Sequence, residues 1–379
     1  MRCSRCFMPD TRPGSVFTEG VCQACLNFDK RGSVNWVERE EQFDRILADH
    51  VGGRYDCLIP VSGGKDSHRI VYEIKRRGLR PLLCTVNDSF THTEAGTANL
   101  RNLVQGSDHI EYTINHDLFT RGTRWAFEDS GEALRFVEYA IYTVPWMIAQ
   151  MYEIPLVIFG ENSAFEYGPV EDNFYSANDV INGIIAKAKR EVPWWKGGGV
   201  TEEDIASIMP KPGGFQPQVL YLSFFYQWSS ITNLKIARKM GFKDLTGEWD
   251  RKGTIENFEQ IDSKAYMVHL WLKYPKFGFQ RVSDIASRRV REGALSLKKA
   301  KALIWSYDHI LDPEAMDDFC QTLGYTPKQF WGVISKAKWN VYHGKQDLAR
   351  RVRDRVHETK QHVAVPSRVL EGDSKWVHT

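Results

Sequence analysis

The chain has 379 residues, a hydrophobic fraction of 42%, a charged fraction of 26% and a formal net charge of +2. This length suggests two domains, and the composition is typical of a soluble globular protein. The sequence has no apolar run of about 18 residues, which excludes a transmembrane helix, and its start, MRCSRCFMPD, lacks the apolar core of a signal peptide. We therefore expect a cytoplasmic protein with no membrane partner. The near-neutral charge also argues against nucleic acid as a partner.

Seven cysteines are present, and four of them lie near the start of the chain. An odd number of cysteines in a cytosolic chain argues against a disulfide framework. The quartet consists of two Cys-x2-Cys pairs separated by fifteen residues, the spacing of a four-cysteine zinc ribbon. Four thiolates close a tetrahedral site, so the predicted zinc is structural; an iron–sulfur cluster is the alternative. The expected ligands are Cys3, Cys6, Cys22 and Cys25.

Downstream of this segment, strands and helices are predicted to alternate. The strands are continuous apolar runs, typical of a parallel sheet covered on both faces. The fold class is therefore α/β with a doubly wound parallel sheet. In chain order, the pattern predicts a helix over 35–50, a strand over 55–61, a helix over 66–77, a strand over 81–86, a helix over 93–105, a strand over 110–114, helices within 116–152 and a strand over 155–159.

The alternation is interrupted at residues 191–214, which contain two adjacent tryptophans, three consecutive glycines and a Pro-Lys-Pro-Gly-Gly sequence. This composition predicts a mobile insertion, either a solvated loop or a lid that closes over bound nucleotide. A strand at 219–225 and a helix at 230–240 follow, and beyond about 250 the chain is mainly helical, with a loosely ordered tail in its last twenty residues. We expect a zinc ribbon at 1–32, a nucleotide-binding domain at 33–245 and a helical substrate or partner region at 246–379.

A glycine-rich loop, Ser62-Gly63-Gly64-Lys65-Asp66-Ser67, lies between the strand over 55–61 and the next helix. The two glycines let backbone N–H groups approach a polyphosphate, and the start of the helix adds partial positive charge. The two serines supply hydroxyl donors, and Lys65 supplies a full charge. Asp66 would repel phosphate, so we expect it to bind Mg²⁺, which is commonly held by carboxylates together with phosphates.

The loop is not a Walker loop, because Ile59 stands where that motif needs glycine and Asp66 where it needs Ser or Thr. It resembles the SGGxDS signature of PP-loop ATP pyrophosphatases, whose fold is adenine nucleotide alpha-hydrolase-like. The resemblance implies that AMP is transferred from ATP to a substrate oxygen, with Lys65 and Asp66 as catalytic residues. The implied ATP-binding residues are Val61, Ser62, Gly63, Gly64, Lys65, Asp66, Ser67, Val86, Asn87, Gly160 and Glu161.

Three activities fit such a loop: amination of an adenylylated carbon, thiolation of a tRNA base, and nucleotide binding without catalysis. Thiolation usually requires catalytic cysteines near the loop. Cys57 and Cys84 fall inside predicted buried strands and Cys320 in a helical pattern, where each is expected to be a small core residue. This placement and the low net charge disfavour thiolation, and the presence of both Lys65 and Asp66 disfavours a non-catalytic role.

Nearly the whole chain, apart from the tail after about 345, resembles the N-acetyl sugar amidotransferase family. One departure is His68-Arg69, where an aromatic or small residue is expected after the loop. The resemblance is carried by Cys3-x2-Cys6-x-Met8-Pro9-Asp10-Thr11-Arg12-Pro13, by PVSGGKDS, by Gly160-Glu161 with Glu166-Tyr167-Gly168, and by Lys273-Tyr274-x2-Phe277-Gly278-Phe279-x-Arg281-x2-Asp284.

This resemblance implies an enzyme that converts the acetamido group of a bacterial sugar to an acetamidino group, with ATP, Mg²⁺ and structural Zn²⁺ as cofactors. The sugar, or nucleotide-sugar, belongs to lipopolysaccharide O-antigen or flagellin glycan. Ammonia comes from glutaminase and cyclase-like partner subunits, and the chain itself shows no glutaminase motif. Aromatic and basic residues in the last motif suit stacking on a sugar or uracil and binding of a diphosphate, although aromatics at this spacing are more often part of a core. The candidate substrate residues are Tyr167, Lys273, Tyr274, Phe277, Arg281 and Asp284.

Overall fold

The computed structural model describes residues 1–170, 173–336 and 346–363. Its centre is a five-stranded sheet in which every strand pairs in parallel with its neighbours, as predicted. The strand order is β5-β4-β3-β6-β7, so the chain moves outward from β3 first in one direction and then in the other. The strands are β3 (Cys57–Pro60), β4 (Pro81–Asn87), β5 (His109–Thr113), β6 (Leu156–Phe159) and β7 (Gln218–Tyr221).

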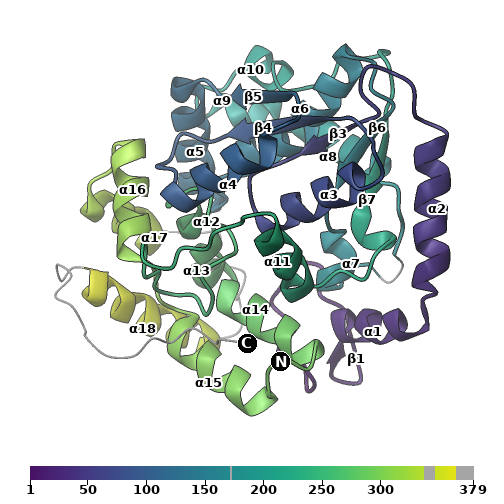
Figure 1. The fold of residues 1–379 in the computed structure, drawn as a ribbon. Helices are drawn as coiled ribbons and strands as arrows, with labels where there is room; N and C mark the ends of the chain where they lie inside the picture. The colour runs from purple at the N-terminus through teal and green to yellow at the C-terminus, as the bar shows by residue number, and fades with distance from the viewer. Residues whose placement is uncertain (171–172, 337–345, 364–379) are drawn as a thin grey trace.

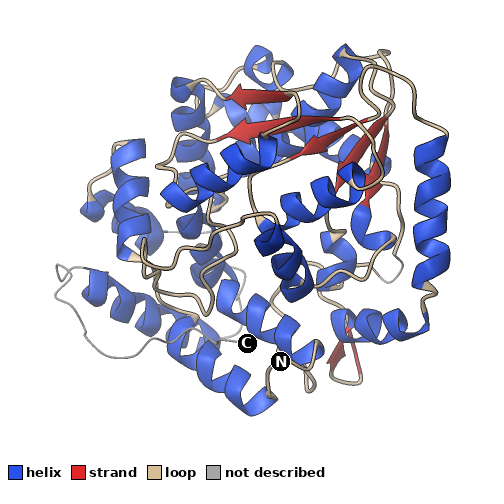
Figure 2. Ribbon diagram, viewed as in Figure 1, coloured by secondary structure: helices blue, strands red, loops and turns tan. Residues whose placement is uncertain are grey.

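Helices cover both faces of this sheet, which confirms the doubly wound architecture (Figure 1; Figure 2). Alternate strand residues point to opposite faces, because side chains along a strand have a period of two. Ile59 and Ile158 pack with α2 (Trp36–Ala48), α3 (Lys65–Lys75) and α4 (Glu94–Val104). On the other face, Leu58 and Val157 pack with α5 (His116–Ser130), α6 (Arg135–Met151) and α8 (Asn178–Arg190).

The N-terminal segment forms a small hairpin followed by a helix, and the four cysteines lie in it. Its elements are β1 (Phe17–Thr18), β2 (Val21–Cys22), α1 (Gln23–Lys30) and the single 3₁₀ turn η1 (Arg31–Ser33). The Asn27 side chain donates hydrogen bonds to the Phe165 carbonyl at 2.9 Å and to the Val170 carbonyl at 2.8 Å. These bonds attach the segment to α7 (Ser163–Tyr167), a helix beside the loop that follows β6.

The expected mobile insertion at 191–214 is wrong, because the segment folds onto the core. It forms two short helices, α9 (Val192–Lys196) and α10 (Glu202–Ala206). Trp195 is fully buried, with its ring 5.8 Å from Phe136 and 6.3 Å from Tyr139 of α6. The glycines at 197 and 198 admit the Trp125 ring, which a Cβ at either position would approach to 2.5 Å or less. The segment therefore packs on α5 and α6, not over the glycine-rich loop.

The last predicted strand, 219–225, is only partly correct. β7 ends at Tyr221, and the chain continues as a 3₁₀ turn, η2 (Leu222–Phe224), before α11 (Ser230–Lys239). The Ser223 backbone N–H donates to the carbonyl of Gly160 at 2.9 Å, so the apolar run continues as a turn bound to the end of β6. The apolar pattern alone did not distinguish this buried turn from a strand.

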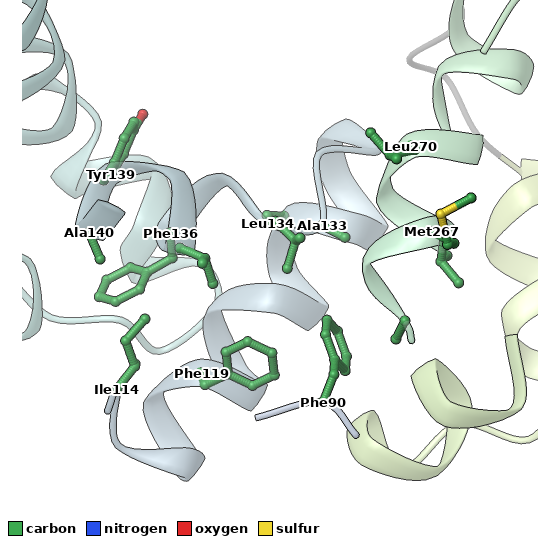
Figure 3. Close-up of a cluster of buried hydrophobic side chains, with 14 of the residues drawn as sticks. Phe90, Ile114, Phe119, Ala133, Leu134, Phe136, Tyr139, Ala140, Met267 and Leu270 are labelled. Carbon is green, nitrogen blue, oxygen red and sulfur yellow. The ribbon is translucent and has the colours of Figure 1, made fainter. Parts of the chain in front are cut away.

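The C-terminal region is helical, as predicted, and shares the main core. Figure 3 shows Phe90 and Phe119 beside Met267 and Leu270 of α12, and the Phe90 and Phe119 rings are 5.1 Å apart. Among the described residues, no helix is long and apolar enough to cross a bilayer. Part of the expected tail, 364–379, lies outside the described residues. The helices are α12 (Tyr266–Trp271), α13 (Lys273–Phe277), α14 (Arg281–Arg291), α15 (Leu297–Tyr307), α16 (Pro313–Leu323), α17 (Pro327–Lys336) and α18 (Gln346–Val363).

Candidate active site

The glycine-rich loop lies where β3 ends and α3 begins, the position at which open α/β sheets bind ligands. Gly63 has φ +84°, and a Cβ there would lie 2.7 Å from the backbone nitrogen of Leu100 in α4. The Ser62 backbone N–H donates to Ser67 Oγ at 3.1 Å, and the Gly64 N–H donates to Ser62 Oγ at 3.3 Å. Val61 is buried, with its N–H bonded to the Cys84 carbonyl at 2.8 Å. The loop is thus a compact turn at the start of α3.

Lys65 and Asp66, the two expected catalytic residues, are bonded to each other at 2.7 Å. Asn233 of α11 donates to the other oxygen of Asp66 at 2.7 Å. Burial opposes ionisation of Asp66, but the charge of Lys65 and the hydrogen bonds from Lys65 and Asn233 outweigh it, so the pKa of Asp66 is lowered. Asp66 is therefore held as a carboxylate, the form that binds a divalent cation.

The other predicted ATP residues come from the ends of β4 and β6, the two strands that flank β3. Val86 and Asn87 end β4, and the Asn87 amide donates to Glu111 at 3.4 Å. Gly160 follows β6, and a Cβ there would meet the Trp228 ring at 3.1 Å. Burial, followed by the Asp66 charge, raises the pKa of Glu161. Glu161 and Asp66 therefore share one electrostatic environment at the carboxyl edge of the sheet.

A segment of the C-terminal region, residues 259–263, crosses this edge, and sequence reasoning missed it. Glu259 lies 3.1 Å from Lys65 Nζ. The Ser263 hydroxyl donates to Asp88, just beyond β4, at 2.8 Å. Burial raises the pKa of Asp262 to about 6, with Asp88 acting in the same direction and a hydrogen bond from Ser62 opposing it. No motif marks these residues in the sequence, because they reach the loop only through the tertiary fold.

Four of the six candidate substrate residues form one connected network. Lys273 Nζ donates to Asp284 at 2.6 Å, and Arg281 donates to the Tyr167 hydroxyl at 3.3 Å. Arg12 from the N-terminal segment also pairs with Asp284, with its guanidinium 4.5 Å from the Tyr167 ring centroid. The network connects to the loop through Arg281, because Arg281 also binds Glu259, the partner of Lys65.

Tyr274 and Phe277 lie elsewhere, at a cavity of about 510 Å³ between the N-terminal segment and helices α13, α15 and α18. Arg2 and Phe7 line the same cavity. The Phe277 ring also stacks on Phe279 at 6.0 Å. The six residues therefore do not surround a single space, and their contact with a sugar stays a prediction.

The cysteine quartet has the geometry of a four-thiolate metal site. All four sulfur atoms lie within 4.8 Å of one another, with 3.9 Å between Cys3 and Cys25 and 3.5 Å between Cys6 and Cys22. A tetrahedral zinc with bonds of about 2.3 Å requires sulfur atoms about 3.8 Å apart. The Arg291 guanidinium donates to Cys6 Sγ at 3.6 Å, which offsets thiolate charge. The residues fit Zn²⁺, and they leave no open coordination position for catalysis.

The remaining three cysteines are buried, as expected from the sequence. Cys57 lies in β3, Cys84 in β4 and Cys320 in α16. Burial raises the pKa of Cys84 and of Cys320 to about 12, and it raises the pKa of Cys57 as well. These thiols are therefore protonated core side chains, not nucleophiles.

Comparisons with known proteins include a family model, a curated protein and a solved structure. The uncharacterized protein MJ1599 of Methanocaldococcus jannaschii is 25% identical over 181 residues, which cover 45% of this chain and 63% of that protein, so the chain spans less than two thirds of that relative. A solved structure from the same organism, described as a predicted subunit of tRNA methyltransferase, matches with a TM-score of 0.22 and 15% identity, over 43% of this chain and 96% of that chain.

The family match lies in the region that contributes Glu259 and α14. Residues 252–353 match the model of the C-terminal domain of WbpG-like LPS biosynthesis proteins. The chain therefore carries a WbpG-like C-terminal domain, and this supports its placement in the N-acetyl sugar amidotransferase family.

Proposed function

We propose that this chain is an ATP-dependent, AMP-forming amidotransferase that converts the acetamido group of a sugar, linked to a nucleotide, to an acetamidino group. The WbpG-like domain supports a role in lipopolysaccharide sugar biosynthesis. The loop supports PP-loop chemistry. The observation that carries the proposal is the contact between the two: Glu259 of the WbpG-like domain lies 3.1 Å from Lys65 of the loop, so a sugar held by that domain can reach a nucleotide held by the loop.

The proposed reaction has two steps. The acetamide oxygen attacks the α-phosphorus of ATP, the bond between the α-phosphorus and the bridging oxygen breaks, and pyrophosphate leaves. Ammonia then adds to the activated carbon, the carbon–oxygen bond breaks, AMP leaves with the oxygen, and one proton is lost. The first step is needed because an amide oxygen is a poor leaving group, whereas AMP is a good one.

The residues of the loop have distinct parts in this scheme. The backbone N–H groups of Gly63 and of the first residues of α3 would bind the polyphosphate. Lys65 neutralises charge that develops on the leaving pyrophosphate. Asp66, oriented by Asn233, would hold Mg²⁺, which supplies further charge neutralisation. The zinc quartet would fix the N-terminal segment against α7.

Ammonia must come from outside this chain in the proposed reaction, and glutaminase and cyclase-like subunits are the proposed source. The second candidate function, thiolation of tRNA, is disfavoured by the chemistry of the cysteines. Cys57, Cys84 and Cys320 are buried with raised pKa values, and the quartet is suited to a metal.

The decisive assay supplies ATP, Mg²⁺, an ammonium salt and UDP-linked acetamido sugars. We expect AMP, pyrophosphate and the small mass loss that accompanies replacement of oxygen by NH. AMP that forms only with tRNA and a sulfur donor would instead support thiolation. Asp66→Ala should reduce turnover by at least about 100-fold while the fold, checked by circular dichroism, is retained. Asp29→Ala, at a half-exposed carboxylate in the N-terminal segment, is the matched control and should retain activity.

A further inference from the structure

A single carboxylate of the WbpG-like domain binds the lysine of the loop and two arginines. Glu259 Oε1 lies 3.1 Å from Lys65 Nζ and 2.5 Å from Arg288 Nη2. Its other oxygen pairs with Arg281, and the Ser230 hydroxyl also donates to Oε1. The side chains of Glu259 and Lys65 are only 3% and 5% exposed, and that of Arg281 is 10% exposed. Three cations therefore meet at one buried acid.

This cluster has more hydrogen-bond donors than Glu259 can satisfy, although Glu256 also acts on both arginines and helps to keep their pKa values raised. Lys65 also binds Asp66, but Arg281 and Arg288 share the one carboxylate. Within the part of the chain that the structure describes, the Nε atoms of both arginines are buried and have no hydrogen-bond acceptor. Buried donors without an acceptor are costly, and guanidinium groups match the geometry of phosphate oxygens. The cluster therefore suits an anion that offers more acceptor atoms than a carboxylate.

The arginines lie within range of the loop itself. Burial and then Asp66 raise the pKa of Glu161, whereas Arg288 and Lys65 act on it in the opposite direction. Arg288 also lies among the charges that lower the pKa of Asp66 against the effect of burial. Arg288 and Lys65 thus act on the same carboxylates at the edge of the sheet, so an anion at Lys65 is also near Arg288.

We propose that Arg281 and Arg288 bind the β- and γ-phosphates of ATP together with Lys65, and that Glu259 occupies this position until the nucleotide replaces it. The inference rests on the proposed function, because it concerns the same ATP site. It assigns half of the pyrophosphate site to the WbpG-like domain. Glu259 is a positioning residue in this scheme: it holds the three cations together in the absence of nucleotide and leaves them when a more highly charged group arrives.

The first test measures binding of magnesium pyrophosphate and of AMP by calorimetry. Arg288→Met and Arg281→Met should each weaken pyrophosphate binding by about 10- to 100-fold, as expected for a lost charge-assisted hydrogen bond, and leave AMP binding unchanged. Arg288→Lys, which keeps the charge and the fold, should show a smaller loss. The proposal is overturned if the Met variants bind pyrophosphate as tightly as the wild type. If the Met variants do not fold, the same result for Arg288→Lys overturns it.

Arg289→Met is the matched control on the same helix. Arg289 forms an equally buried pair at 2.8 Å, but its partner is Glu256 and not Glu259. We expect its pyrophosphate affinity to equal that of the wild type. An equal loss in this variant would show that any buried ion pair of α14 has the same effect, and would overturn the assignment.

The second test concerns Glu259. Glu259→Gln removes the competing charge and retains a hydrogen-bonding side chain, so pyrophosphate should bind more tightly and raise the melting temperature more than in the wild type. Weaker or unchanged pyrophosphate binding would show that Glu259 is only structural. If all binding results hold but no acetamido sugar is aminated, the proposed function fails while this inference stands; if the wild type binds no pyrophosphate, both fail.

Discussion

Arg12, in the cysteine-bearing N-terminal segment, forms an ion pair with Asp284 of α14. The Asp284 side chain is 3% exposed and also accepts a hydrogen bond from Lys273 at 2.6 Å. The Arg12 guanidinium stacks on two rings, 4.5 Å from the centroid of Tyr167 and 5.4 Å from that of Phe279. These contacts give Asp284 a structural role, because it joins the N-terminal segment to the WbpG-like domain.

Arg12→Met should therefore destabilise the chain by about 1.5–3 kcal/mol, the typical contribution of a hydrogen bond to a charged group, because Lys273 still pairs with Asp284. Urea unfolding monitored by tryptophan fluorescence measures this change. Arg5→Met is the control, since Arg5 and Asp29 form a half-exposed pair, and its effect should be at most about 1 kcal/mol. Equal losses in the two variants would contradict the structural role of Arg12.

The same pair predicts a pH dependence of stability. Burial opposes ionisation of Asp284, but Arg12, Lys273 and Arg281 outweigh it and hold its pKa well below the ordinary value of 3.8. Because the folded-state pKa is lowered, the stabilisation is fully present above the unfolded pKa and is lost as pH falls through the folded value. As pH falls from 5 into the acid range, the urea midpoint of Asp284→Asn should fall less than that of the wild type. If the two midpoints fall in parallel with pH, Asp284 does not cause the pH dependence.

Zinc removal should unfold the N-terminal segment and disturb the candidate active site. Structural zinc sites supply on the order of 10–16 kcal/mol of apparent binding energy, and Asn27 attaches this segment to the carbonyls of Phe165 and Val170 beside α7. We expect one zinc per chain by elemental analysis, and loss of zinc together with increased hydrogen exchange in α7 for Cys22→Ser. The control variant, Cys320→Ser, should retain zinc. Iron in place of zinc in the wild-type protein would favour the alternative, an iron–sulfur cluster.

Gly63→Ala tests the close packing of the loop on α4. The substitution places a Cβ 2.7 Å from the Leu100 nitrogen at a residue with φ +84°, so we expect a cost of about 1–3 kcal/mol and loss of ATP binding. Gly183→Ala in α8, where a Cβ meets no atom within 4 Å, should instead stabilise the helix by up to about 1 kcal/mol. Thermal melts with and without ATP distinguish the two variants. Normal ATP binding by Gly63→Ala would show that ATP binding does not require the positive φ of residue 63.

Local patterns predicted the sheet and the loop well, because the signals lie within single elements. Leu58 and Val157 belong to apolar runs that become paired central strands, and Gly63 belongs to a motif whose backbone conformation is local. The cysteine spacing likewise predicted a quartet of clustered sulfur atoms.

The errors have a common physical origin, which is packing between distant segments. Trp195 resembles a loop residue among glycines, yet it is buried against Phe136. Glu259 and Asp262 carry no motif, and only the tertiary fold brings them to Lys65 and Ser62. Asp284 stays a candidate substrate residue, but local pattern gave no sign of its ion pair with Arg12, which lies 272 residues away in the sequence.

Asp262 predicts a pH-dependent effect on the loop. Burial raises its pKa to about 6, Asp88 adds to this, and Ser62, His92 and Arg251 oppose it. Its Oδ1 atom is buried without a hydrogen-bond partner within the described residues. Because the folded-state pKa is raised above the unfolded value, stability should fall as pH rises from about 4 to 6 and then remain level. Asp262→Asn should remove this fall, a gain on the order of 3 kcal/mol at pH 7 for a shift from 3.8 to about 6.

The same ionisation should affect anion binding at Ser62. Above about pH 6 the Asp262 carboxylate places a negative charge beside the loop, which repels a polyphosphate unless a cation intervenes. In magnesium-free buffer, the ratio of pyrophosphate affinities of Asp262→Asn and the wild type should therefore rise as pH increases through 6, and Mg²⁺ should abolish the rise. Protonation of pyrophosphate itself affects both proteins equally, so it does not change this ratio of affinities. A ratio that stays constant with pH would therefore show that Asp262 does not face the phosphate site.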